Sequence, residues 1–92
     1  MADKRLHVYI EGKVQMVWFR DHTRTEARRL GLSGWVKNLP DGRVEAVFEG
    51  PEEDLKSVFQ WCHQGSPNSR VDRVTPEWDE AKGQFQGFEI TY

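Results

Sequence analysis

The sequence has 92 residues, and a chain of this length buries roughly 60 to 70 per cent of its unfolded surface, enough for one compact domain over residues 1–92. Its 13 Lys and Arg residues against 15 Asp and Glu give a net charge of -2, which excludes a broad electrostatic attraction for nucleic acid or an anionic membrane. The single cysteine, Cys62, excludes an intramolecular disulfide and a zinc site built from several cysteines.

The first third of the chain predicts a strand followed by a helix. Residues 5–11 alternate apolar and polar side chains, which indicates a strand with one buried face, and Gly12 is expected to end it. A helix of about three turns is predicted next, because buried-type residues recur at helical spacing and Gly31 supplies a terminator. The stripe expected to face the core is Phe19, Thr23, Ala27 and Leu30.

A β-hairpin is predicted in the middle of the chain. Residues 33–39 and 43–49 are two extended segments that flank Pro40, Asp41 and Gly42. Proline presets the first turn position, aspartate tolerates the second, and glycine accepts positive φ.

A second helix is predicted from Pro51, placed at the first helical position, because residues 52–54 are acidic and suit the positive end of the helix dipole. Its buried stripe is expected to be Leu55, Val58, Phe59 and Cys62.

The C-terminal part predicts two further strands. Residues 65–69 are typical of a loop, and residues 71–78 and 85–92 are predicted to be extended, with Phe88, Ile90 and Tyr92 on one face. The resulting order predicts an α+β fold: a ferredoxin-like βαββαβ sandwich, with a mostly antiparallel sheet, two helices on one face and an extra C-terminal strand.

The junction between the first strand and the first helix, residues 12–20, is the first candidate site. Such a junction presents unpaired backbone N–H groups beside the positive end of a helix dipole, which favours a bound phosphate. Arg20 begins the helix there, and its guanidinium can engage two phosphoryl oxygens at once. From the residues alone, Arg20 could equally solvate a helix terminus, and Asn38 could simply hydrogen-bond its own turn.

Two motifs resolve these alternatives. Residues 12–20, Gly-Lys-Val-Gln-Met-Val-Trp-Phe-Arg, resemble the acylphosphatase signature Gly-x-Val-Gln-Gly-Val-x-Phe-Arg at every fixed position but Met16. Residues 34–45, Gly-Trp-Val-Lys-Asn-Leu-Pro-Asp-Gly-Arg-Val-Glu, resemble the second signature of that family, Gly-x-Val-x-Asn-x-x-Asp-Gly-x-Val-Glu. With the matching order of elements, the resemblance to the acylphosphatase family covers essentially the whole chain.

The resemblance implies metal-free, cofactor-free hydrolysis of the carboxyl–phosphate bond of acyl phosphates. It implies that Arg20 and Asn38 are the catalytic residues: Arg20 binds the phosphoryl group and Asn38 positions the attacking water. Backbone N–H groups of the phosphate-binding loop are expected to assist Arg20. That loop comprises Gln15, Met16, Val17, Trp18, Phe19 and Arg20. Inorganic phosphate or sulfate is expected to bind there as an anion ligand. The indole of Trp18 is expected near the mouth of the site, with a half-buried structural role as the alternative.

Met16 departs from the family signature. At a position with φ > 0, methionine costs roughly 1 to 2 kcal/mol relative to glycine, and we expect it to affect the catalytic rate more than the fold. The alternative hypothesis is therefore a catalytically impaired anion-binding or regulatory domain of the same architecture. A related alternative is a piece of a larger protein that carries such a domain.

The remaining expectations concern metals, partners and location. The three histidines, His7, His22 and His63, are dispersed over three elements without ligand spacing, so no metal site is expected. Cys62 is expected to be a small core residue. We expect a monomer with a small-molecule acyl phosphate substrate, no nucleic-acid or membrane partner, and a cytoplasmic location, since no secretion signal or apolar run of ~18 residues is visible.

Overall fold

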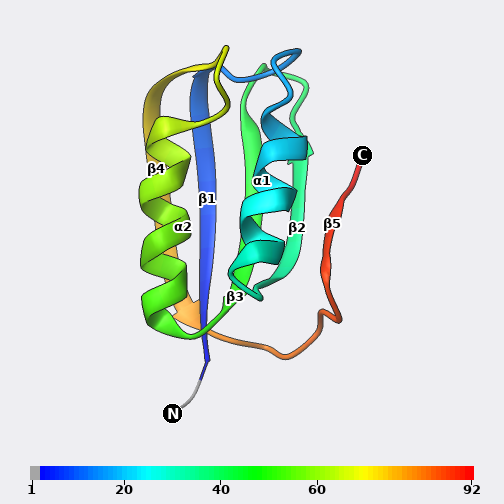
Figure 1. The fold of residues 1–92 in the computed structure, drawn as a ribbon, viewed down its shortest axis with the longest axis vertical. Helices are drawn as coiled ribbons and strands as arrows, with labels where there is room; N and C mark the ends of the chain where they lie inside the picture. Colours follow the sequence, from blue (N-terminus) through cyan, green and yellow to red (C-terminus); the bar gives the residue numbers. More distant parts are fainter. Residues whose placement is uncertain (1–2) are drawn as a thin grey trace.

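The computed structural model describes residues 3–92 and shows one sheet covered on one face by two helices (Figure 1). Its elements are β1 (Lys4–Lys13), α1 (Phe19–Arg29), β2 (Ser33–Asn38), β3 (Val44–Gly50), α2 (Glu52–Gln64), β4 (Arg70–Glu80) and β5 (Phe88–Ile90). The five strands lie in the order β4-β1-β3-β2-β5. Every neighbouring pair is antiparallel except β2 and β5, which are parallel. The predicted ferredoxin-like α+β sandwich is confirmed.

The core lies between the sheet and the two helices. Alternate residues of β1 point into it, so Leu6, Val8 and Ile10 are fully buried, as the period-2 pattern predicted. Phe48 on β3 stacks on Phe88 of β5, with ring centroids 5.2 Å apart. The helices contribute their predicted stripes, which are buried at Phe19, Thr23 and Ala27 on α1 and at Leu55, Val58 and Cys62 on α2.

The start of α2 and the end of β1 differ from prediction. Pro51 is the N-cap of α2, not its first helical residue, because its ψ of 142° is extended and its carbonyl accepts the first helical hydrogen bond, from Leu55 N–H at 3.1 Å. Gly12 does not end β1, which continues to Lys13 through a bulge between Glu11 and Gly12. At Gly12, φ is +133° and a Cβ would lie 2.1 Å from the carbonyl oxygen of Arg70. Glycine therefore permits the bulge there.

Two apolar side chains of the predicted helix stripes are less buried than expected. Leu30 is the C-cap of α1 and is only partly buried. Phe59 is only partly buried, because it lies at the edge of the stripe of α2, where its ring contacts His63 and Trp78. Tyr92 shares the predicted face with Phe88 but is exposed. It lies beyond the end of β5, where its ring packs on Arg20 and not in the core.

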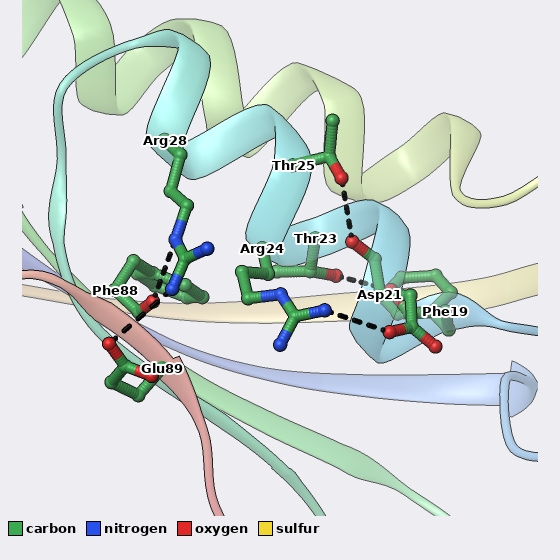
Figure 2. A network of polar contacts seen from close by, with 8 residues as sticks. All are labelled: Phe19, Asp21, Thr23, Arg24, Thr25, Arg28, Phe88 and Glu89. Carbon is green, nitrogen blue, oxygen red and sulfur yellow. Dashed lines mark hydrogen bonds and ion pairs between the residues drawn. The ribbon is translucent and has the colours of Figure 1, made fainter.

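The last strand is shorter than predicted, since only Phe88–Ile90 within residues 85–92 are strand. Two backbone hydrogen bonds attach this segment to β2: Gly34 N–H donates to Gly87 O and Thr91 N–H donates to Val36 O, both at 2.9 Å. From α1, Arg28 Nε donates to Phe88 O at 3.2 Å and Arg28 Nη2 pairs with Glu89 (Figure 2). These contacts hold the C-terminal segment beside β2 and direct it toward the start of α1.

Burial of Phe88 is predicted to hold β5 on the sheet. Phe88→Ala should lower the free energy of unfolding by about 3 to 5 kcal/mol, the usual cost of deleting a buried phenyl ring. Chemical denaturation followed by circular dichroism measures this loss.

Glu89→Ala, at the adjacent and exposed position, is the control, and it should change stability by less than about 0.5 kcal/mol. Equal effects of the two substitutions would contradict the role assigned to the Phe88 ring.

Candidate active site

The loop between β1 and α1, residues 14–18, is fixed to the core by buried apolar side chains. Val14 and Val17 are buried, as is Phe19 at the start of α1. Ser66, itself buried in the loop after α2, donates its hydroxyl to Val17 O at 2.7 Å. The loop is therefore fixed on the side that faces the core, and its outer surface is left free to contact a ligand.

Gln15 joins this loop to the hairpin. Its Nε2 donates to Leu39 O at 2.8 Å and to Arg43 O at 2.9 Å, on the two sides of the β2–β3 turn. Because Asn38 directly precedes Leu39, this side chain fixes the distance between the loop and Asn38. Gln15 was predicted for the phosphate-binding loop, and its side chain has a clear structural role.

Two non-glycine residues of the loop have left-handed backbone conformations. Met16 and Trp18 both have φ of 63°, a conformation that costs about 1 to 2 kcal/mol for residues with a Cβ. The Met16 side chain is fully exposed, so it packs against no neighbouring side chain. Backbone strain of this kind collects at functional sites.

The loop presents unpaired backbone donors. Within residues 3–92, the N–H groups of residues 16–20 donate to no backbone or side-chain acceptor, and the first N–H groups of α1 are among them. Unpaired N–H groups at the positive end of a helix dipole favour an anion. This part of the chain can therefore bind a phosphoryl group through its backbone.

Arg20 differs from the other arginines of α1. Arg24 pairs with Asp21 at 3.2 Å and Arg28 with Phe88 O and Glu89 (Figure 2). Arg20 makes no ion pair or hydrogen bond to a residue of the described chain; its guanidinium carbon lies 5.2 Å from the centroid of the Tyr92 ring. Stacking on an aromatic ring orients a guanidinium while its N–H groups stay available.

Asn38 is the last residue of β2, and its side-chain oxygen is exceptional. Asn38 Oδ1 is buried and finds no hydrogen-bond donor within residues 3–92. A buried acceptor left unpaired costs about 1 to 3 kcal/mol, and native structures rarely tolerate one without a functional reason. An O–H donor, such as a water molecule bound with the ligand, would satisfy this oxygen.

Arg20 and Asn38 meet at one cavity of about 230 Å³. Its lining residues are Val14, Met16, Trp18, Phe19, Arg20, Asp21 and Asn38. The structure thus brings together most of the predicted site residues and places Trp18 at the cavity, as expected. Gln15 and Val17 do not line it; they hold the loop in position.

Tyr92 is the residue that sequence reasoning missed at this site. The parallel pairing of Val36 with Ile90 implies that Asn38 and Tyr92, each two residues further on, leave the sheet side by side. A period-2 pattern does not indicate whether two strands are parallel, so the sequence placed Tyr92 on one face with Phe88 and Ile90 and did not indicate that it lies beside Asn38.

Other candidate groups lie outside this cavity. Burial raises the pKa of the Cys62 thiol to about 12, so Cys62 is a protonated core residue, as expected, and no nucleophile. Among residues 3–92, no three His, Cys, Asp or Glu side chains gather where they could hold a metal ion. In the same part of the chain, no helix is long and apolar enough to cross a membrane.

Comparison with known proteins gives one consistent result. The family model described as acylphosphatase matches residues 6–90. The acylphosphatase of Rubrobacter xylanophilus is 55% identical over 87 residues, which cover 95% of this chain and 79% of that relative. The acylphosphatase of Natronomonas pharaonis is 53% identical over 91 residues, 98% of each chain. The crystal structure of acylphosphatase from Bacillus subtilis superposes with a TM-score of 0.94 at 37% identity, covering 97% of this chain and 99% of that one.

Relief of the left-handed strain at Met16 gives a testable prediction. Met16→Gly should raise the free energy of unfolding by about 0.5 to 1 kcal/mol, because the gain from removing the Cβ at φ > 0 exceeds the entropy that glycine adds to the unfolded chain. Urea denaturation measures the change.

Met16→Ala is the matched control, since it keeps a Cβ at the same φ and should change stability by less than about 0.5 kcal/mol. A greater gain for alanine than for glycine would show that side-chain exposure, and not backbone strain, sets the cost.

Proposed function

We propose that Arg20 and Asn38 are the catalytic residues of this chain. It belongs to the acylphosphatase family and hydrolyses acyl phosphates to a carboxylate and inorganic phosphate. The observation that carries this assignment is their meeting at one small cavity, beside the unpaired N–H groups of the loop. The alternative of a catalytically silent domain is not favoured, because the Met16 side chain projects into solvent and leaves the cavity open.

In this proposal the phosphoryl group is bound by charge and by backbone donors together. The N–H groups of residues 16–20 and the guanidinium of Arg20 converge on its equatorial oxygens. In phosphoryl transfer the transition state spreads negative charge over these oxygens, so fixed donors stabilise it more than the ground state. The Tyr92 ring behind Arg20 limits the guanidinium to orientations that face the cavity.

Asn38 acts on the nucleophile. Its buried Oδ1 accepts a hydrogen bond from the attacking water and directs a lone pair of that water toward phosphorus. An amide cannot remove the proton of the water, so Asn38 positions the water and is not a general base. This function uses the one buried side-chain oxygen that has no donor in the described chain.

The reaction then needs no further catalytic group. The water oxygen forms a bond to phosphorus while the bond from phosphorus to the carboxyl oxygen breaks, and the carboxylate leaves with the bonding electron pair. A carboxylate is a weak base, so no general acid has to protonate it. The proton of the water passes to a phosphoryl oxygen or to the departing carboxylate. We propose that this chemistry proceeds without a metal ion or cofactor.

The same site is proposed to bind inorganic phosphate or sulfate, since either anion presents the oxygens that the loop and Arg20 recognise. We further propose a monomeric, single-domain protein of the cytoplasm. The exposed helix surfaces support the first of these, because they carry many charged side chains, and the reduced, buried Cys62 supports the last.

The two residues are predicted to fail in different ways. In assays of benzoyl phosphate hydrolysis in EDTA, Arg20→Ala and Asn38→Ala should each lower kcat/KM by about 100- to 1000-fold or more. Inorganic phosphate should no longer inhibit the residual activity of Arg20→Ala, because Arg20 binds the phosphoryl group. It should still inhibit Asn38→Ala, because Asn38 acts on the water.

Arg24→Ala provides the control, since Arg24 lies one turn further along α1 and is paired with Asp21. It should keep near wild-type turnover and phosphate inhibition. Near-normal turnover of Arg20→Ala or Asn38→Ala would remove that residue from the mechanism, and a requirement for added metal would contradict the metal-free reaction.

A further inference from the structure

Large apolar side chains that are exposed collect around the cavity. Among the residues that the structure describes, four such side chains are exposed: Met16 at 101%, Tyr92 at 94%, Trp18 at 71% and Trp78 at 45%. Met16 and Trp18 line the cavity that contains Arg20 and Asn38, and the Tyr92 ring lies against the Arg20 guanidinium. We call Met16, Trp18 and Tyr92 the apolar rim.

The apolar rim does not serve the fold. Its three side chains bury little or none of their surface in the core, so they contribute little of the hydrophobic stabilisation that such residues usually supply. Two of them also have strained backbone conformations. Exposed apolar residues that lie together, beside strained backbone, indicate a binding surface.

The size of the cavity indicates which part of a substrate meets the rim. At about 230 Å³, it is smaller than the ~300 to 1,000 Å³ of pockets that enclose a whole small-molecule ligand. The phosphoryl group occupies its inner part, where the loop N–H groups and Arg20 lie. The acyl group, attached through one bridging oxygen, must then leave the cavity across its mouth.

The charges at the cavity disfavour an acidic acyl group. Arg20 is committed to the phosphoryl group, and the other ionisable residue of the lining, Asp21, is already paired with Arg24 at 3.2 Å, so the lining offers no free cation to a carboxylate on the acyl group. Aromatic side chains, by contrast, pack well against flat apolar groups. The lining and the rim together favour an uncharged, apolar acyl group.

We propose that the apolar rim is the binding subsite for the acyl group, and that the enzyme prefers acyl phosphates with an aromatic or bulky apolar acyl group to those with a small one. This inference rests on the proposed function, since it requires the phosphoryl group to lie on the loop beside Arg20. It assigns the side chain of Met16 to substrate specificity.

The test is the ratio of kcat/KM for benzoyl phosphate to kcat/KM for acetyl phosphate, measured for the full chain and its variants. Because both substrates carry the same phosphoryl group, damage to the loop lowers both rates and leaves the ratio unchanged. Trp18→Ala should lower this ratio by about tenfold, and Tyr92→Ala and Met16→Gly should lower it by about threefold each. These effects are at or below the low end of the discrimination that hydrophobic pockets achieve, because the subsite is open to solvent. Trp18→Phe, which keeps a ring, should retain most of the preference.

Trp78→Ala is the matched control. Trp78 is also an exposed tryptophan, but it lines a different cavity together with Lys4 and Glu80, and its removal should leave the ratio unchanged.

An unchanged ratio in both Trp18→Ala and Tyr92→Ala, with good turnover, would overturn the subsite and leave the proposed function intact. Absence of turnover of both substrates by the unchanged chain would overturn the proposed function itself, and the subsite with it.

Discussion

The cavity between Arg20 and Asn38 depends on one constraint: buried side chains hold the backbone of the β1–α1 loop so that its N–H groups point outward. Val14, Val17 and Phe19 fix the loop to the core, Ser66 holds the carbonyl of Val17, and Gln15 connects the loop to the hairpin beside Asn38. With the loop fixed on its core side, the N–H groups of residues 16–20 remain free for an anion. The proposed phosphoryl site thus depends on the core packing, and preorganised donors of this kind need no rearrangement when charge develops in the transition state.

This arrangement stores unfavourable free energy at the site. Met16 and Trp18 have left-handed backbone, the oxygen of Asn38 is buried without a donor, and three large apolar side chains stay in water. The first two features cost stability in the free protein, and the exposed side chains contribute little to it. In the proposed complex, the attacking water hydrogen-bonds Asn38 and the acyl group covers the apolar rim. The stacked pair Phe48 and Phe88, together with the fully buried strand residues, offsets these costs at a distance from the chemistry.

Much of the fold could be predicted because the signals were local. Alternation in β1, helical spacing from Phe19 and the Pro40-Asp41-Gly42 turn each specify an element from neighbouring residues, and the two motifs singled out Arg20 and Asn38. The features that could not be predicted depend on distant pairings. The bulge at Gly12 is set by the approach of Arg70 on β4, the role of Gln15 by the hairpin 24 residues away, and the position of Tyr92 by the parallel register of β5 on β2. No periodicity within a single segment contains that information.

The most direct test of this account is whether an oxyanion binds to the loop backbone. Titration of the ¹⁵N-labelled protein with inorganic phosphate in EDTA, followed by two-dimensional NMR, reports each amide separately. The account predicts that the backbone N–H signals of residues 16–20 shift together and saturate, and that Arg20→Ala weakens this binding. A second cavity is lined in part by Arg43, Arg70 and Arg73. Amide signal shifts confined to that cavity, with the loop signals unmoved, would contradict the account.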